Sequence, residues 1–295
     1  MHRIIFLISY PFLMGLSLLP FPIFYLFSDF MYFLVYRVFK YRTKVVRKNL
    51  SLAFPEKTAK ERKAIERKFY RHMCDVFLEM IKTITISEKE MKKRFVFENI
   101  ELIRDFEKKG KSSILTCGHY SSWEGMLSIG YHLNEKAYGV YNKLSNPHFE
   151  RLIKKSRERH HAYLLPRYET VQTIQQHHKD GHIALYGFAN DQSPKLRSKS
   201  YWRTFMGVKV PVFTGAERIA KEHDLPVTFA AITRVKRGHY KASISLLTED
   251  PKSLKENELT DLFTEKLEAQ IKKDPSQYLW THNRFKYKDK APIQA

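Results

Sequence analysis

The sequence predicts an α/β fold, a central mixed sheet covered by helices, with a hydrophobic membrane anchor at the N-terminus. From about residue 95 onward, short apolar runs of strand length alternate with amphipathic helical segments. Such alternation is typical of a sheet with helices packed on its faces. The stretch from Ile4 to Tyr36 is almost wholly apolar, with Asp29 as its single charge. We therefore expect residues 1–42 to form the anchor and residues 43–295 to form one α/β domain.

Prolines interrupt the apolar N-terminal stretch at Pro11, Pro20 and Pro22. We expect two helices, Ile4 to Leu19 and Ile23 to Tyr36, in place of one straight span of about 20 apolar residues. A bent or re-entrant anchor and a true span both fit this pattern. A cleavable signal peptide fits less well, because no small-residue cleavage site follows the apolar run. A helix buried in the core of a soluble protein is the remaining alternative.

A basic block follows the apolar stretch directly. It consists of Arg37, Lys40, Arg42, Lys44, Arg47 and Lys48. Basic residues next to an apolar segment tend to stay on the cytoplasmic side and attract anionic lipid head groups. The whole chain has 52 Lys and Arg against 31 Asp and Glu, a formal net charge of +21. This charge predicts an anionic partner, either a membrane surface, an acidic protein or nucleic acid, without choosing among them.

Local signals place the remaining elements in order. A capping box from Thr58 to Glu61 opens a long amphipathic helix. Asn146 and Pro147 start a later helix, and Thr214 to Glu217 is a second capping box. Strands are expected at 95–97, 112–116, 137–141, 163–165, 183–188, 208–213, 227–235 and 240–247. Helices are expected up to about 108 and at 123–133, 147–159, 170–178, 214–222 and 258–272. We find no repeats and no low-complexity linker.

The segment from Ile114 to Gly125 (ILTCGHYSSWEG) has the strongest chemical pattern. An apolar strand runs into a loop that holds His119, and a helix begins near Glu124. A carboxylate that accepts the proton of one imidazole nitrogen fixes the tautomer and leaves the other nitrogen free to take a proton from a hydroxyl. The spacing therefore predicts a His119–Glu124 dyad. A loop histidine held by an ordinary hydrogen bond is the alternative.

Further polar groups follow other predicted strands. Tyr141 ends one strand, and Asp191 follows another. Ligands in open α/β sheets bind beyond the carboxyl ends of the strands, so both residues are candidates for substrate binding. Arg157 and Arg159 lie at the end of the helix that Pro147 starts, where a bidentate phosphate contact is possible. A solvated helix face is the alternative for these two arginines.

The chain offers little for a disulfide or metal site. Its two cysteines, Cys74 and Cys117, are too few for a disulfide framework and lack metal-type spacing. Cys117 lies two residues before His119, but its place at the end of an apolar run favours a packed strand residue over a nucleophile. Gly181 separates His182 from the histidines before it, and we expect exposed histidines there.

An ordered series of short motifs runs through nearly the whole chain. The motifs are RKNLSLAFP at 47–55, GHYSSWE at 118–124, VY at 140–141, SNP at 145–147, NDQ at 190–192, FMG at 205–207, GAERIA at 215–220 and QYLWTHNRFK at 277–286. Their order and spacing resemble the late acyltransferases of lipid A biosynthesis, the lauroyl and myristoyl transferase family. Two positions depart from that resemblance, because Asn142-Lys143 stands in place of an Arg-Pro pair and Asn283 in place of a basic residue.

The resemblance implies a glycerolipid acyltransferase-like fold, with His119 as catalytic base and Glu124 as its partner. It associates Arg157, Arg159 and Asp191 with the substrate pocket. The implied reaction moves a fatty acyl chain from a thioester on acyl carrier protein to a hydroxyl of a lipid A precursor. Amides of the loop from Gly118 to Trp123 are the expected oxyanion donors. No metal or cofactor is required.

The same resemblance implies a place at the cytoplasmic face of the inner membrane of a Gram-negative bacterium, with no nucleic-acid partner. A glycerophospholipid or other lysolipid acyltransferase is the second enzyme hypothesis, although no E-G-T-R-type phosphate motif follows the histidine. A thioesterase would result if water replaced the acceptor. A basic peripheral membrane or nucleic-acid binding protein is the non-enzymatic alternative.

Overall fold

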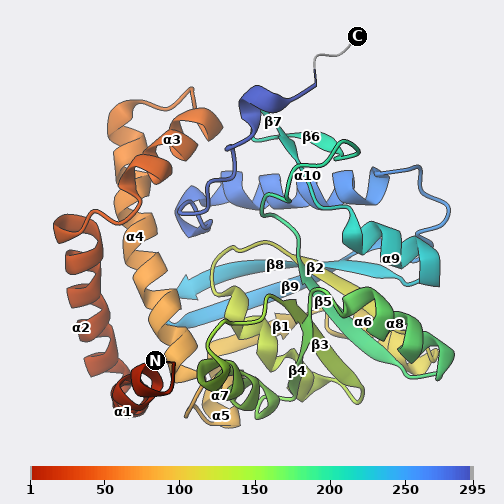
Figure 1. The fold of residues 1–295 in the computed structure, drawn as a ribbon, viewed down its shortest axis with the longest axis horizontal. Helices are drawn as coiled ribbons and strands as arrows, with labels where there is room; N and C mark the ends of the chain where they lie inside the picture. Colours follow the sequence, from red (N-terminus) through yellow and green to blue (C-terminus); the bar gives the residue numbers. More distant parts are fainter. Residues whose placement is uncertain (1, 293–295) are drawn as a thin grey trace.

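The structure, a computed structural model, describes residues 2–292 and contains a seven-stranded sheet with helices on both faces (Figure 1). The sheet order is β1-β9-β8-β2-β5-β3-β4. Its strands are β1 (Phe95–Glu98), β2 (Ser113–Cys117), β3 (Lys136–Tyr141), β4 (Ala162–Pro166), β5 (Ala184–Ala189), β8 (Val227–Lys236) and β9 (His239–Thr248). β8 and β9 pair antiparallel, whereas the other neighbours pair parallel. The predicted α/β class with a mixed sheet is confirmed.

Helices cover the two faces of this sheet because successive strand residues point to opposite sides. Ile114 of β2 packs in one apolar cluster with α8 (Thr170–Lys179), α9 (Gly215–His223) and α10 (Glu258–Lys273). The next residue, Leu115, packs in another cluster with α6 (Glu101–Lys108) and the 3₁₀ helix η2 (Trp123–His132). The sheet is thus buried on both sides, as the apolar runs predict.

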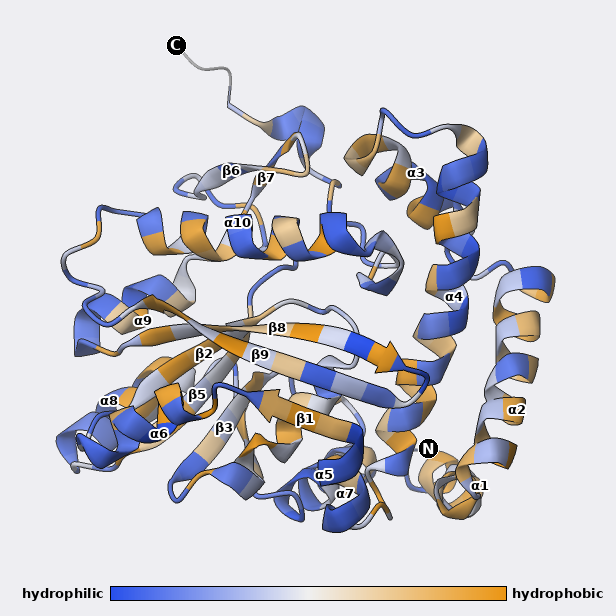
Figure 2. Ribbon diagram, turned by 180° about the vertical axis from the view of Figure 1, so that it is seen from behind, coloured by the Kyte–Doolittle hydropathy of each residue, from blue (hydrophilic) through white to orange (hydrophobic). Residues whose placement is uncertain are grey.

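The N-terminal helices stand along one side of the molecule (Figure 1). They are α1 (His2–Leu18), α2 (Phe21–Tyr32) with its continuation η1 (Phe33–Val38), α3 (Thr43–Ala53) and the long α4 (Ala59–Lys82). The break before α2 confirms the two-helix prediction, and Pro20 stands at the N-cap position. Among residues 2–292, one helical stretch, Phe21–Val38, is long and apolar enough to cross a membrane, and 17% of it is buried. Figure 2 shows the hydrophobic residues on α1 and α2.

Local caps account for several boundaries. Thr58 and Glu61 form the predicted capping box at the start of α4. Asn146 caps α7 (Pro147–Glu158) as expected, with its side chain accepting from the amide of His148. The second predicted box is wrong, because Thr214 makes no side-chain cap. Glu217 instead accepts hydrogen bonds from the amide and hydroxyl of Thr260.

Other differences concern short elements. The predicted strand 208–213 lies outside the main sheet and forms a hairpin of β7 (Val208–Pro211) with β6 (Trp202–Phe205). The turn between them holds Met206 and Gly207 at positive φ. The segment after Ser122 is a 3₁₀ helix rather than an α-helix. The helices α3 and α5 (Glu88–Arg94), and the short 3₁₀ helices η3 (Pro275–Gln277) and η4 (Lys288–Lys290), were not predicted.

Candidate active site

His119 and Asp191 meet where β2 and β5 end. These strands are neighbours and run parallel, and their last residues, Cys117 and Ala189, are in register. The residues that follow both strands therefore emerge at the same edge of the sheet. Nδ1 of His119 lies 2.7 Å from an Asp191 carboxylate oxygen, and the His119 amide donates to the same oxygen at 3.1 Å. Asp191 is buried, with 4% of its surface exposed.

The electrostatics favour a charged pair. Burial of the imidazole lowers the pKa of His119, but the charge and hydrogen bond of Asp191 and the charge of Glu124 raise it more, so this pKa lies above its ordinary value. Burial raises the pKa of Asp191, yet His119 and the backbone hydrogen bonds lower it more, so this carboxyl is ionised at neutral pH. A carboxylate on Nδ1 assigns the proton to that nitrogen and leaves Nε2 as the basic atom.

Nε2 of His119 faces the side-chain amide of Gln192, whose nitrogen lies 3.3 Å away. The indole of Trp123 packs against the imidazole of His119, with the two ring centroids 5.4 Å apart. Gln192 belongs to the NDQ motif at the end of a predicted strand, and the sequence predicted no specific role for it. The signal was its position directly after Asp191, which puts the amide at the same sheet edge as the imidazole.

Glu124 lies in a second pair, which differs from the expected His119–Glu124 contact. Its carboxylate accepts from both Nε and Nη2 of Arg157, with the Nε contact at 2.8 Å. Both side chains are largely buried, at 13% and 18% exposed. A guanidinium from α7 offers Glu124 a fixed positive partner, while Nδ1 of His119 is already taken by Asp191. Glu124 acts on His119 through its charge, not through a hydrogen bond.

The other two candidate residues have partners of their own. Arg159 donates to the carbonyl of Ile84, just beyond the end of α4. The hydroxyl of Tyr141 donates to Glu150 on α7. The structure thus brings together His119, Asp191, Glu124 and Arg157, and it gives Arg159 and Tyr141 contacts outside that group. Substrate binding by Arg159 and Tyr141 stays a prediction.

The loop amides are mostly used within the protein. Those of His119, Tyr120 and Ser121 donate to Asp191, Gly118 and Gln277 respectively. The expectation that this loop supplies the oxyanion donors is therefore wrong for these three amides. The side-chain amide of Gln192 is the donor group that remains next to Nε2.

A C-terminal segment holds the histidine loop in place. The amide of Leu279 donates to the carbonyl of His119 at 3.1 Å. Asn49 on α3 is fully buried, and its side-chain amide donates to the carbonyls of Trp280 (2.9 Å) and His282 (2.7 Å). The ring of His282 accepts from the amide of Ser193, just past Gln192. The motifs at 47–55 and 277–286 thus meet here, a contact that no local pattern in the sequence predicts.

An apolar cavity adjoins Glu124. It is partly open to solvent, and the empty space in it and in its mouth together amounts to about 440 Å³. Phe21 and Tyr25 of α2 line one part, Met91 and Phe95 line another, and Glu124 lies at its wall. The N-terminal helices therefore contribute to a space that reaches the Glu124–Arg157 pair.

The thiol of Cys117 does not fit a nucleophile. Burial and the nearby Asp191 raise the pKa of this thiol to about 12, so it stays protonated at neutral pH. Its side chain packs with the apolar cluster below the sheet. The prediction of a packed strand residue is confirmed.

Comparison with known proteins decides the family. The sequence model of the bacterial lipid A biosynthesis acyltransferase family matches residues 1–287. The chain belongs to this family. It is thus an acyltransferase of lipid A biosynthesis, which favours the enzyme hypotheses over the nucleic-acid binding alternative.

Relatives of this lipid A acyltransferase come from several bacteria. This chain is 26% identical over 270 residues to the lipid A biosynthesis lauroyltransferase of Escherichia coli K12, and the alignment covers 91% of this chain and 87% of the relative. It is 23% identical over 250 residues to the palmitoleoyltransferase of the same strain, covering 84% and 79%. A lipid A biosynthesis acyltransferase of Haemophilus influenzae is 24% identical over 248 residues, covering 83% and 78%. The family model covers both the residues that line the cavity and the histidine loop.

Proposed function

We propose that this enzyme moves a fatty acyl chain from a thioester on acyl carrier protein to a hydroxyl of a lipid A precursor, with His119 as general base. The observation that carries the proposal is the buried Asp191 carboxylate on Nδ1 of His119, within a family of lipid A acyltransferases. The carboxylate fixes the tautomer, so Nε2 is the atom that accepts the proton.

The reaction needs no covalent enzyme intermediate. Nε2 of His119 takes the proton as the acceptor oxygen attacks the thioester carbonyl, which forms the new C–O bond. The tetrahedral intermediate then collapses and breaks the C–S bond. The leaving thiolate takes the proton back from the imidazolium. Asp191 and Glu124 stabilise that imidazolium because both carboxylates raise the pKa of His119.

Gln192 is the proposed donor to the oxyanion. Its side-chain nitrogen lies 3.3 Å from Nε2, so an N–H group stands beside the atom where the acceptor proton is removed. A donor already held at the position of the developing charge stabilises the intermediate without reorganisation. The carbonyl of Arg284, which accepts from the hydroxyl of Ser193, helps to hold the segment that follows Gln192.

The apolar cavity is the proposed site of the fatty chain. Its lining by Phe21, Met91 and Phe95 suits hydrocarbon, and Glu124 in its wall also acts on His119 through its charge. In this arrangement Arg157 and Glu124 lie next to the thioester end of the bound fatty acyl chain. Arg159 and Tyr141 remain proposed contacts for the polar part of the acceptor.

Charge and composition support the proposed partners. Acyl carrier protein is acidic, and a chain with net charge +21 attracts an acidic donor protein. The basic block after the apolar helices favours the cytoplasmic face of the inner membrane. The relatives in Escherichia coli and Haemophilus influenzae come from Gram-negative bacteria.

Mass spectrometry of a defined reaction tests this function. The purified protein is incubated with acyl carrier protein loaded with fatty chains of about 12, 14 or 16 carbons. These trial donors have extended lengths on the order of half the thickness of a bilayer's hydrocarbon core. A lipid A precursor and a lysophospholipid are offered as separate acceptors. We expect the mass of one acyl group to be added to the lipid A precursor. Acylation of the lysophospholipid alone, or release of free fatty acid at an equal rate without acceptor, would contradict the proposal.

A further inference from the structure

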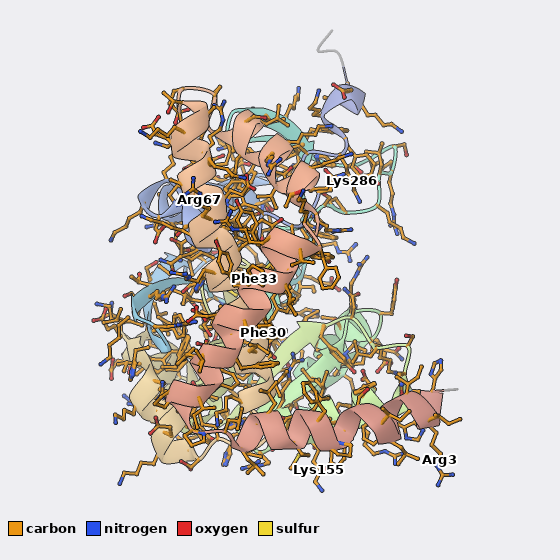
Figure 3. The ribbon with its side chains drawn as sticks, turned by 90° about the vertical axis from the view of Figure 1, so that its left-hand side faces the viewer. Arg3, Phe30, Phe33, Arg67, Lys155 and Lys286 are labelled. Carbon is orange, nitrogen blue, oxygen red and sulfur yellow. The ribbon has the colours of Figure 1, made fainter. Side chains whose placement is uncertain are left out.

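An apolar face covers the outside of the first two helices. On α1, Ile4, Ile8 and Phe12 are 63%, 73% and 60% exposed, and they recur every four residues. On α2 and η1, Leu26, Phe30 and Phe33 are 71%, 53% and 53% exposed. Figure 3 shows α2 with Phe30 and Phe33 on the side of the molecule that faces the viewer, and α1 extending across its base to Arg3. Soluble monomers rarely expose large contiguous apolar patches, and such patches mark interaction or membrane-binding sites.

The inner side of α2 is bound to the folded body by charges. Arg237, in the turn between β8 and β9, pairs with Asp29 at 3.0 Å and with Asp75 of α4 at 2.6 Å. Ser28 donates to the same Asp75 at 2.7 Å, and both residues are buried. The single acidic residue of the apolar segment therefore faces the body, away from the exposed apolar face.

The corner between α1 and α2 is also fixed. Nζ of Lys82, at the end of α4, donates to the carbonyls of Ser17 and Leu19 at 2.7 and 2.5 Å. The hydroxyl of Thr85 donates to the carbonyl of Ser17 as well. These donors satisfy carbonyls that the end of a helix leaves free. Near the other end of α1, Phe6 packs on His148 and Phe149 of α7.

We propose that α1, α2 and η1 form a platform that lies in one leaflet of an anionic membrane and does not cross it. A crossing by Phe21–Val38 would carry Lys82, Asp75 and Arg237 into hydrocarbon, because these groups hold the helix to the body, and buried charges are costly there. It would also send α1 to the opposite side and break its contacts with α7. An in-plane position keeps all of these contacts and buries only the apolar outer face.

Charge complementarity favours anionic lipid as the partner of the exposed apolar face. Exposed basic side chains flank the apolar face at both ends, at Arg3 on α1 and at Arg37 and Lys40 after α2. Anionic head groups around the platform would meet these cations. A second copy of the chain on the same face would bring like charges together, which opposes a symmetric dimer there.

Cysteine labelling in inside-out inner-membrane vesicles tests whether the platform crosses. Arg3→Cys and Lys44→Cys, which both remove one exposed positive charge, are treated with a membrane-impermeant maleimide before and after detergent. The wild-type chain, with Cys74 buried and Cys117 partly buried, gives the background. We expect the two positions to label alike without detergent. Protection of Arg3→Cys until detergent is added, with Lys44→Cys labelled throughout, would overturn the proposal.

Vesicle binding tests the surface. Leu26→Glu alters the apolar face, whereas Leu246→Glu, on β9 at 38% exposed, is the matched control. With vesicles of phosphatidylethanolamine and phosphatidylglycerol, we expect Leu26→Glu to lose most binding and Leu246→Glu to bind as the wild type. Equal binding by both variants, or self-association of the wild type in place of vesicle binding, would refute the lipid platform. Neither readout measures acyl transfer, so these results stand apart from the proposed function.

Discussion

The proton on Nδ1 of His119 has a buried acceptor in Asp191, a residue that its place after a predicted strand and the family resemblance had associated with the substrate pocket. A fixed carboxylate at 2.7 Å orients the ring and favours its charged form. Glu124, five residues after His119, instead binds Arg157. The two carboxylates thus act differently on one imidazole, one by direct contact and the other by charge at a distance.

Removal of the Asp191 charge should shift the pH profile. His119 must be neutral to act as a base, and its pKa is raised, so kcat/KM of the wild type should fall as the pH drops through a value above the ordinary histidine range of about 6.5. In Asp191→Asn the charge that raises this pKa is lost, and the acidic limb should move to lower pH. The plateau rate should also fall by roughly 100-fold. An acidic limb that stays in place would show that Asp191 does not set the titration.

Loss of the Gln192 amide should slow the chemical step. We expect Gln192→Ala to lower kcat by roughly 10²- to 10³-fold, the usual effect of removing one oxyanion donor, with little change in KM. Gln175→Ala, which removes an exposed amide bonded to Glu222, is the matched control and should retain full activity. If Gln192→Ala turned over at the control rate, another group would have to stabilise the oxyanion.

At the level of secondary structure, the positions of His119 and Asp191 after the strands β2 and β5 could be predicted from the sequence. The strands predicted at 112–116 and 183–188 indicated that the residues after them would lie near one sheet edge, and the structure pairs these strands in register up to Cys117 and Ala189. The pairing of His119 with Asp191 over Glu124 could not be predicted, because it depends on which strands are neighbours. The contact between Asn49 and the segment at 280–282 could not be predicted either, because it joins residues that lie 231 and 233 positions apart in the chain.

The Asn49 contacts should stabilise the molecule and position the histidine loop. Asn49→Ala leaves the carbonyls of Trp280 and His282 without their donor in a buried place, at a cost of about 2 kcal/mol. We expect a lower urea midpoint and reduced transfer activity. Asn142→Ala, at an exposed position, should change stability by less than about 0.5 kcal/mol. Equal midpoints for the two variants would refute the structural role of Asn49.

At the scale of the whole molecule, the sequence indicated an apolar N-terminus but not its attachment. Pro20 and the hydrophobic runs predicted two helices, and the structure has them. The pairing of Asp29 with Arg237 brings together residues far apart in the chain, so no local pattern could reveal it. The proposed platform and catalytic body are thereby one unit, and α2 lines the cavity beside Glu124.

Arg237 should hold this unit together. Arg237→Met leaves the buried Asp75 with the hydroxyl of Ser28 and, as a cation, the more distant Arg234 at 3.5 Å. Breaking a fully buried pair costs about 3–5 kcal/mol, and the 30% exposure of Arg237 reduces this to roughly 2 kcal/mol. We expect a lower free energy of unfolding in urea and faster proteolysis between α1 and α3. Arg218→Met, at an exposed position, is the control, and a variant as stable as this control would contradict the attachment.

The rate of acyl transfer by His119→Ala is the sharpest test of His119 as the general base. The variant is compared with His178→Ala, which replaces an exposed histidine, in the mass-spectrometric reaction with acyl carrier protein and a lipid A precursor. We expect the rate of transfer to fall by roughly 10³-fold or more in His119→Ala, with a melting temperature like that of the wild type and full activity in the control. Transfer by folded His119→Ala at close to the wild-type rate would contradict the assignment of the base.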